Sequence, residues 1–259
     1  MTFDQTGRRH HPQIKAQKNS PSILVIGGSF AGGYGVTDQQ TFSYLLDKTV
    51  KHHQVINFGT GGHSSWQAYL RLQSYLTNQN NAKPALILYA MIDDHRNRNI
   101  ADFSWINYLT TRNGEKLIPP HLRHHNNRFK AYKGSTVPLW PLEAHSALMT
   151  KIHQAVLLIN HQGSESEKNK VTLEIIKRMQ QTADEHGSTF LLVMLTEIDP
   201  ELMKDLEKTT IKMLDCHTPG WHRNPNLRVG GQGHPNAAYH QKYATCLKQW
   251  IDKTHLPAQ

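Results

Sequence analysis

The residue with the strongest chemical signal in this sequence is Ser29, which lies in the stretch IGGSFAGGYGV at residues 26–36. A continuous apolar run precedes it and stops at a pair of glycines, which is typical of a buried strand that ends in a tight turn. Ligands of parallel α/β sheets bind beyond the carboxyl ends of the strands, where free backbone N–H groups could hold an oxyanion. The stretch lacks the Gly-Lys-Ser/Thr of a P-loop, so a nucleophilic serine is favoured over a phosphate-binding loop or a plain turn.

Three further stretches follow a similar pattern of predicted strand, polar or glycine-rich turn, and helix. VINFGTGGHSSWQ at residues 55–67 contains Gly62, whose N–H could point at the same site as the serine. LYAMIDDHRNRN at residues 88–99 leaves a buried strand, and VGGQGHPNAAYHQKYA at residues 229–244 presents His234 just before a helix. Because these turns lie at one edge of the sheet, we expect them to form one site. Its further candidate pocket residues are Gly28, Phe30, His63, Asp94, His95 and Gln232.

The order and spacing of these stretches resemble the SGNH/GDSL hydrolase superfamily, whose four sequence blocks span about residues 23 to 245 of this chain. Ser29 in GGSF matches the nucleophile block, Gly62 in NFGTGG the glycine block, and His234 in GHPNAAYH the histidine block. The resemblance is to uncharacterised, divergent members. It implies a serine ester hydrolase in which Ser29 attacks and His234 takes the proton. The oxyanion would be held by the N–H groups of Ser29 and Gly62 and by the residue at the family's asparagine position, which is Asp93 here.

This sequence departs from the family pattern at three positions. The aspartate that precedes the serine is replaced by Gly28, which should affect mainly the structure of the loop. Asp93 replaces the asparagine of the oxyanion hole, and a carboxylate cannot donate a hydrogen bond unless it is protonated. The acid that stands two or three residues before the histidine is absent, and Gly231 and Gln232 occupy those positions. We therefore expect a Ser-His dyad or an incomplete triad.

If Ser29 and His234 act together, the two side chains must lie within hydrogen-bond distance of each other. A ring nitrogen of His234 should lie roughly 2.6–3.5 Å from the hydroxyl oxygen of Ser29. The other ring nitrogen needs an acceptor, for which a main-chain carbonyl of residues 229–232 or the Gln232 side chain is the first candidate. A neutral acceptor stabilises an imidazolium less than a carboxylate does, so hydrolysis should be slow.

Two functions from different classes are compatible with these residues. The first is deacylation or deacetylation of a small ester or an O-acylated carbohydrate. The second is a catalytically weak or inactive binding module for an acylated sugar or an anionic partner, because the orienting acid is missing. Aromatic residues between positions 103 and 140 could stack on a sugar, although packing within that segment is the favoured role.

No cofactor and no metal site is expected. Histidines cluster at residues 121–125, but no carboxylate or cysteine stands at ligand spacing from them. Asp93, Asp94 and His95 could ligate a cation, although ion pairs of the two carboxylates with the neighbouring Arg96 or Arg98 are favoured.

Alternating strands and helices must position these residues. Continuous apolar runs predict strands, and apolar residues at turn spacing predict helices between them. The alternation predicts an α/β protein with three layers (α/β/α) and a flavodoxin-like parallel sheet of order 2-1-3-4-5. The aromatic and proline-rich residues 101–142 predict an inserted lid-like segment, and GSESEKNK at residues 163–170 a surface loop. Strands are predicted near 23–27, 54–57, 85–90, 189–195 and 211–215, and helices near 41–50, 64–76, 141–160, 171–187 and 236–252.

Length and composition narrow the remaining options. With 259 residues, the chain is expected to form a single domain over 21–259 after an extended arm at 1–20. The net charge is +9, but the basic residues are spread along the chain without a recognition motif, so no nucleic-acid partner is expected. We find no transmembrane segment and no signal peptide, which makes a cytoplasmic location the default expectation. Cys216 and Cys246 leave one disulfide open.

Overall fold

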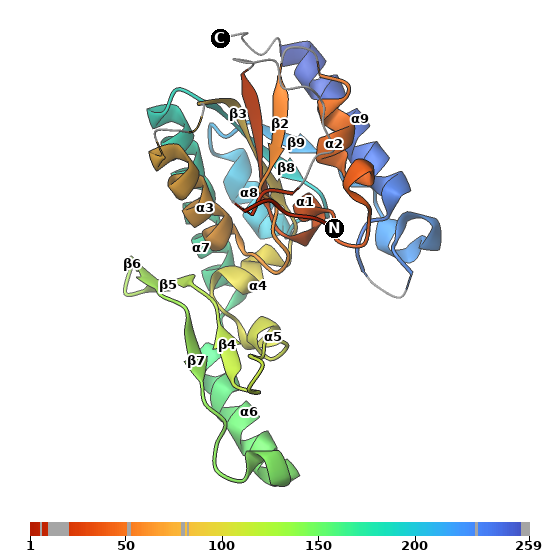
Figure 1. The fold of residues 1–259 in the computed structure, drawn as a ribbon. Coiled ribbons are helices and arrows are strands. Elements are labelled where there is room, and N and C mark those ends of the chain that lie inside the picture. Colours follow the sequence, from red (N-terminus) through yellow and green to blue (C-terminus); the bar gives the residue numbers. More distant parts are fainter. Residues whose placement is uncertain are drawn as a thin grey trace.

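The computed structural model describes residues 1–5, 7–9, 21–50, 53–78, 81, 83–230 and 233–254. Within these residues, five strands form one parallel sheet in the order β2-β1-β3-β8-β9 (Figure 1). The predicted order 2-1-3-4-5 and the parallel pairing of the first and third strands are therefore confirmed. The strands are β1 (Ser22–Gly27), β2 (Gln54–Asn57), β3 (Pro84–Met91), β8 (Thr189–Met194) and β9 (Met213–Asp215).

Helices cover both faces of the sheet and complete the three predicted layers (Figure 1). One face carries α3 (Ser65–Thr77), α7 (Glu165–Glu185) and α8 (Pro200–Glu207), and the other carries α1 (Ser29–Gly32), α2 (Phe42–Asp47) and α9 (Ala237–Thr254). Side chains of β1 alternate between the two cores. Leu24 and Ile26 pack in the first core, and Ile23 and Val25 pack in the second. All four are completely buried, which is why this strand is a continuous apolar run.

An arm of the chain projects away from the sheet between β3 and α7 (Figure 1). It follows the short helix α4 (His95–Asn99) and corresponds to the predicted insert, with a further helix at its end. The arm contains α5 (Phe103–Ile106), the antiparallel pair β4 (Lys116–Ile118) and β7 (Ser135–Val137), the antiparallel pair β5 (His121–His125) and β6 (Arg128–Tyr132), and α6 (Ala147–His161). Short 3-10 helices occupy Asp38–Gln40, Glu143–His145, Trp221–Arg223 and Pro225–Leu227.

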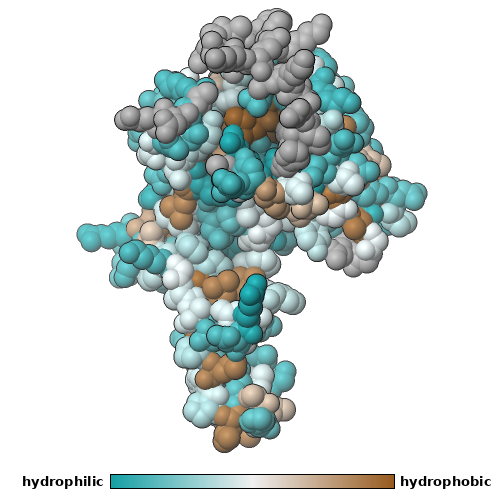
Figure 2. Space-filling view, viewed as in Figure 1, coloured by the Kyte–Doolittle hydropathy of each residue, from teal (hydrophilic) through white to brown (hydrophobic). Residues whose placement is uncertain are grey.

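Helix α6 is buried on one side and exposes large apolar side chains on the other. His153 and Leu157 are buried on one side, whereas Leu148, Ile152 and Ile159 recur at helical spacing on the other with exposed fractions of 69%, 41% and 77%. Figure 2 shows apolar side chains along this arm. The helix predicted at 141–160 begins only at Ala147, because the Ser146 hydroxyl accepts the N–H of Met149 and caps it.

The surface loop predicted at residues 163–170 is wrong, because α7 already begins at Glu165. Ser164 caps the helix by accepting the N–H of Glu167 at 3.1 Å. Its polar first turns are partly buried by long-range contacts, in which Asn169 accepts a hydrogen bond from Arg96 at 2.9 Å. The polar residues of this stretch therefore form the first turns of α7, where they contact side chains of other segments.

The described part of the N-terminal segment packs on the loop after α1. Phe3 and Arg9 form an isolated antiparallel bridge, and the Arg9 side chain is fully buried. Its guanidinium donates to the carbonyls of Gly32 at 2.7 Å and Val36 at 2.9 Å and also pairs with Asp38. Residue 6 and residues 10–20 of the predicted arm lie outside the described residues.

A disulfide joins Cys216, just after β9, to Cys246 in α9, with the two Cα atoms 5.8 Å apart. The bridge ties the edge strand of the sheet to the helix that follows the His234 loop. No helix in the described part of the chain is long and apolar enough to cross a membrane.

Replacing both cysteines by serine should destabilise the protein. The bridge spans a sequence separation of 30 residues, so its loss should lower the free energy of unfolding by about 2–4 kcal/mol. Urea denaturation of the wild type and the double serine variant without reductant would measure the difference. The wild type with reductant serves as a control, and equal midpoints in all three samples would contradict the prediction.

Candidate active site

Ser29 stands at the point where β1 ends and α1 begins, one residue beyond the carboxyl end of the strand. The residue is only 5% exposed. Its N–H is at the start of α1 and forms no hydrogen bond to any described residue. This donor is therefore free to bind an anionic oxygen next to the Ser29 hydroxyl.

Gly62 is held beside this turn by a close backbone approach. A Cβ on Gly59 would lie 2.3 Å from the amide nitrogen of Gly32, so only glycine fits at position 59. Three residues later, Gly62 adopts a φ of +77°, and its N–H has no hydrogen-bond acceptor among the described residues. Two unengaged N–H groups thus come from the two turns that the sequence predicted to converge.

His234 reaches Ser29 from the far end of the chain. Its Nε2 atom lies 2.9 Å from the Ser29 hydroxyl oxygen, within the range expected from the sequence. The His234 carbonyl accepts the N–H of Val229 at 2.9 Å, which closes the loop that presents the ring. Phe30 and Tyr34 pack against the imidazole at centroid distances of 5.5 and 4.7 Å.

The other ring nitrogen of His234 is buried and has no hydrogen-bond partner among the described residues. The expected acceptors Gly231 and Gln232 lie outside the described residues, and the described carbonyls of 229 and 230 do not take this role. Burial lowers the pKa of the His234 imidazole, and the charge of Arg98 lowers it further, whereas Asp94 opposes the shift. The ring is therefore neutral at neutral pH, the form that can accept a proton.

The Asp93 carboxylate is committed to structural contacts. Its two oxygens accept hydrogen bonds from Arg96 at 2.8 and 3.0 Å, and one also accepts the N–H of Asp199 at 3.0 Å. Both oxygens therefore act as hydrogen-bond acceptors in these contacts. The oxyanion role that the resemblance to SGNH/GDSL hydrolases implies for position 93 requires a hydrogen-bond donor, which this carboxylate does not supply in these contacts.

The imidazole of His95 occupies the space that a side chain at position 28 would need. A Cβ on Gly28 would lie 2.5 Å from Nε2 of His95. The ring is completely buried, and its Nδ1 lies 2.8 Å from the Tyr89 hydroxyl, which is itself 2.6 Å from the Ser65 hydroxyl. The absence of a side chain at Gly28, just before Ser29, therefore leaves room for the buried His95 ring.

The remaining predicted pocket residues lie around this centre with different exposures. Phe30 is buried and packs edge-on against Trp221 at 5.5 Å. His63 is largely buried, and burial together with neighbouring arginines lowers its pKa to about 4. Asp94 is exposed and lines two pockets, of about 210 and 250 Å³.

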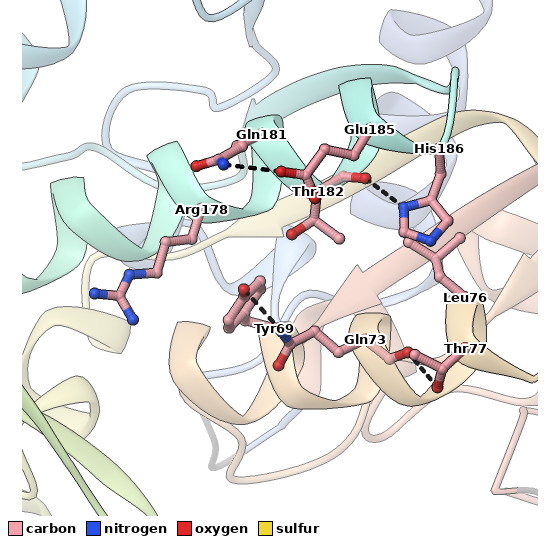
Figure 3. A pocket seen from close by; sticks show the side chains of 9 residues that line it. All are labelled: Tyr69, Gln73, Leu76, Thr77, Arg178, Gln181, Thr182, Glu185 and His186. Atoms are coloured by element: carbon pink, nitrogen blue, oxygen red, sulfur yellow. Dashed lines mark hydrogen bonds between the residues drawn. The ribbon is translucent and has the colours of Figure 1, made fainter.

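A third pocket, of about 210 Å³, lies between α3 and α7 (Figure 3). Its polar side chains pair with one another or with the helix backbone: Gln73 with Tyr69, Gln181 with Glu185, and His186 with the carbonyl of Thr182. None of the predicted site residues lines it. Among the described residues, no group of three His, Cys, Asp or Glu side chains could hold a metal ion.

Sequence reasoning assigned Arg98 only an ion pair and gave Trp105 no individual role. Arg98 lines the larger of the two pockets around Asp94, and its Cζ lies 4.3 Å from the centre of the Trp105 ring. The Trp105 ring in turn lies 3.5 Å from where a Cβ of Gly62 would stand. No local pattern signals this cluster, because its members come from three separate turns and helices.

No known family model matches the sequence, and no curated protein is significantly similar to it. Solved structures do share its fold. A member of the lipolytic protein G-D-S-L family from Veillonella parvula aligns over 90% of this chain and 98% of its own, with a TM-score of 0.52 and 12% identity. LAE5, an alpha/beta hydrolase enzyme from the metagenome of Lake Arreo, aligns over 88% and 94%, with a TM-score of 0.51 and 12% identity.

A carbohydrate esterase, whose active site is described as having divergent catalytic and non-catalytic binding functions, aligns over 93% of this chain and 67% of its own. Its TM-score is 0.50 and its identity 14%. Together with the sheet order, these likenesses show that the chain has the SGNH/GDSL-hydrolase-like fold.

The contact between Gly28 and His95 predicts a compensating pair of substitutions. Gly28→Asp should destabilise the protein by about 1–3 kcal/mol, because its side chain collides with the imidazole. His95→Ala opens space, so the double variant Gly28→Asp/His95→Ala should be more stable than the sum of the two single effects predicts. Urea denaturation of the four proteins gives the coupling energy. Purely additive effects would contradict the steric explanation.

Proposed function

We propose that this protein is a serine ester hydrolase that removes an acyl or acetyl group from a small ester or an O-acylated carbohydrate. The observation that supports this most directly is the 2.9 Å contact between the Ser29 hydroxyl and Nε2 of His234. The two residues are 205 positions apart in sequence, so the fold brings them together. The N–H groups of Ser29 and Gly62, which belong to two turns in backbone contact and donate to no described group, are the candidate donors that acyl transfer needs.

In the proposed reaction, neutral His234 accepts the hydroxyl proton of Ser29 while the oxygen attacks the ester carbonyl. The carbonyl oxygen becomes an oxyanion held by the two N–H groups. Collapse of this intermediate breaks the ester bond, and the imidazolium returns its proton to the departing alcohol. Water then attacks the acyl-serine, with His234 again acting as the base, and the acid product leaves.

The proposed enzyme should be slow. In a complete triad a carboxylate stabilises the imidazolium and fixes its tautomer, and its loss costs about 10⁴ in kcat in a serine protease. The buried Nδ1 of His234 has no such partner among the described residues. The positive charge of Arg98 also disfavours the imidazolium.

The alternative function is a binding module for an acylated sugar or an anionic ligand. It is favoured by the same unpartnered Nδ1 of His234 and by the structural role of the Asp93 carboxylate. The similarity to a carbohydrate esterase with divergent catalytic and non-catalytic binding functions is compatible with either function.

Hydrolysis of p-nitrophenyl acetate by wild type and variants separates the two functions. Ser29→Ala and His234→Ala should each reduce the enzyme-dependent rate to background, because each removes one half of the dyad. Ser135→Ala, which changes an exposed serine on β7 in the arm, is the matched control and should retain the wild-type rate. A wild-type rate equal to that of Ser29→Ala would exclude the esterase function.

The pH dependence should identify His234 as the base. Because the folded pKa of His234 lies below 6.5, kcat/KM should stay constant as pH falls to about 6.5 and then decline through that lowered pKa. Asp94→Asn removes a charge that raises this pKa, so its acid limb should move to lower pH. Arg98→Met should move the limb to higher pH. Stopped-rate assays from pH 4.5 to 8.5 measure the limbs, and shifts in the opposite directions would refute the assignment.

A further inference from the structure

Arg98 is a buried cation that forms no ion pair with a described carboxylate, although the charge of Asp94 acts on it from a greater distance. The residue is 9% exposed, and no carboxylate of the described chain forms an ion pair with it. Its Nη1 donates a long hydrogen bond of 3.3 Å to the carbonyl of His63, and its charge faces the Trp105 ring. Neither Nε nor Nη2 has a hydrogen-bond partner among the described residues. Such a charge is costly to bury unless something satisfies it.

Arg96, two residues earlier on the same helix, shows what a structural arginine looks like here. It is similarly buried, yet it binds both oxygens of Asp93, donates to Glu165 at 2.7 Å and lies 3.5 Å from Asp199. The fold therefore supplies ion-paired carboxylates for one arginine of α4, whereas the other has only the more distant charge of the exposed Asp94. This contrast argues that Arg98 is kept for a ligand.

The pocket that Arg98 lines, hereafter the Arg98 pocket, lies beside the proposed oxyanion site. It has a volume of about 250 Å³ and is lined by Asp94, Asn97, Arg98, Ser104, Trp105 and Tyr108. The Trp105 ring lies 3.5 Å from the position of a Cβ on Gly62. A group in this pocket would thus be close to an ester carbonyl held at the Gly62 N–H.

We propose that the Arg98 pocket binds a carboxylate carried by the ester substrate, so that the preferred substrate is an anionic ester. This inference rests on the proposed esterase function. A guanidinium presents a planar set of donors that matches a carboxylate, and charge-assisted hydrogen bonds of this kind are among the strongest in proteins. Ser104 and Asn97 add polar groups, and the Trp105 ring adds a flat wall.

The negative charge of Asp94 weakens the affinity of the Arg98 pocket for a carboxylate. Its carboxylate lines the same pocket but is exposed, so water screens its charge, whereas the Arg98 charge is buried and screened less. The anion is therefore attracted to the buried guanidinium and opposed by the charge at the surface. Removing the Asp94 charge should strengthen the binding of a carboxylate.

Matched esters test the proposal. 4-Acetoxybenzoate and 4-acetoxybenzamide have nearly the same shape and differ by one charge on the alcohol side. The p-nitrophenyl monoester of adipic acid and its terminal amide make the same comparison on the acyl side. We expect wild type to hydrolyse the carboxylate member of one pair with a kcat/KM about 10- to 100-fold higher than that of its amide. Assays at pH 8 keep His234 neutral in every variant.

The variants assign the preference to Arg98. Arg98→Met should abolish it by raising KM for the carboxylate ester while the amide changes little, and Arg98→Lys should retain part of it. Asp94→Asn should increase the preference. Arg112→Met, which removes an exposed cation of the arm, should leave it unchanged. Thermal unfolding of each variant confirms that it is folded. Equal kcat/KM within both pairs in wild type, or a preference that survives in Arg98→Met, would overturn the proposal.

Calorimetric binding of 4-acetoxybenzoate to the Ser29→Ala variant separates this proposal from the esterase function. Binding that is lost in Ser29→Ala/Arg98→Met and weaker for the amide supports the Arg98 pocket even if wild type proves inactive. Absence of any Arg98-dependent binding, together with Ser29-dependent hydrolysis of p-nitrophenyl acetate, would retain the esterase and reject the carboxylate site.

Discussion

The direct backbone contact between Gly32 and Gly59 holds the two turns of the site together. A Cβ on Gly59 would lie 2.3 Å from the Gly32 nitrogen, so the contact exists only because the residue has no side chain. Asn57, buried at the end of β2, reinforces it by donating to the Ala31 carbonyl at 2.8 Å and accepting the Gly59 N–H at 2.8 Å. The contact keeps the turn that carries Ser29 against the turn that carries Gly62. Donors positioned in advance stabilise a developing charge without reorganisation at the moment of reaction.

The two arginines of α4 near these turns differ in the carboxylates around them. Arg96 forms ion pairs with carboxylates from three segments of the chain, whereas Arg98 on the same helix forms none with a described carboxylate and is influenced by the exposed Asp94 only from a greater distance. Burial lowers the pKa of His63, His95 and His234, and the positive charge of Arg98 lowers each of them further. These lowered pKa values favour the neutral form of the three imidazoles.

Two departures from the SGNH/GDSL pattern are structurally coherent. Gly28 replaces an aspartate at a position where the His95 imidazole fills the space of the missing side chain. Asp93 replaces an asparagine and serves as an anchor that joins Arg96 to the turn before α8. Gly28 thus leaves room for the His95 ring, and both oxygens of Asp93 accept hydrogen bonds. The missing acid before His234 is different, because the Nδ1 atom remains without a described partner.

The sequence by itself determined the sheet, its order and the convergence of Ser29, Gly62 and His234, because continuous apolar runs and glycine turns are local signals of buried parallel strands. It did not determine which charges meet. GSESEKNK was predicted to be a loop, yet the structure folds it into α7 and uses Glu165 and Asn169 to satisfy Arg96. The sequence HRNRN contains both arginines in equivalent local settings. Only the tertiary structure decided that carboxylates far away in the chain reach one and not the other, since a charge is satisfied by neighbours in space whereas a strand is specified by neighbours in sequence.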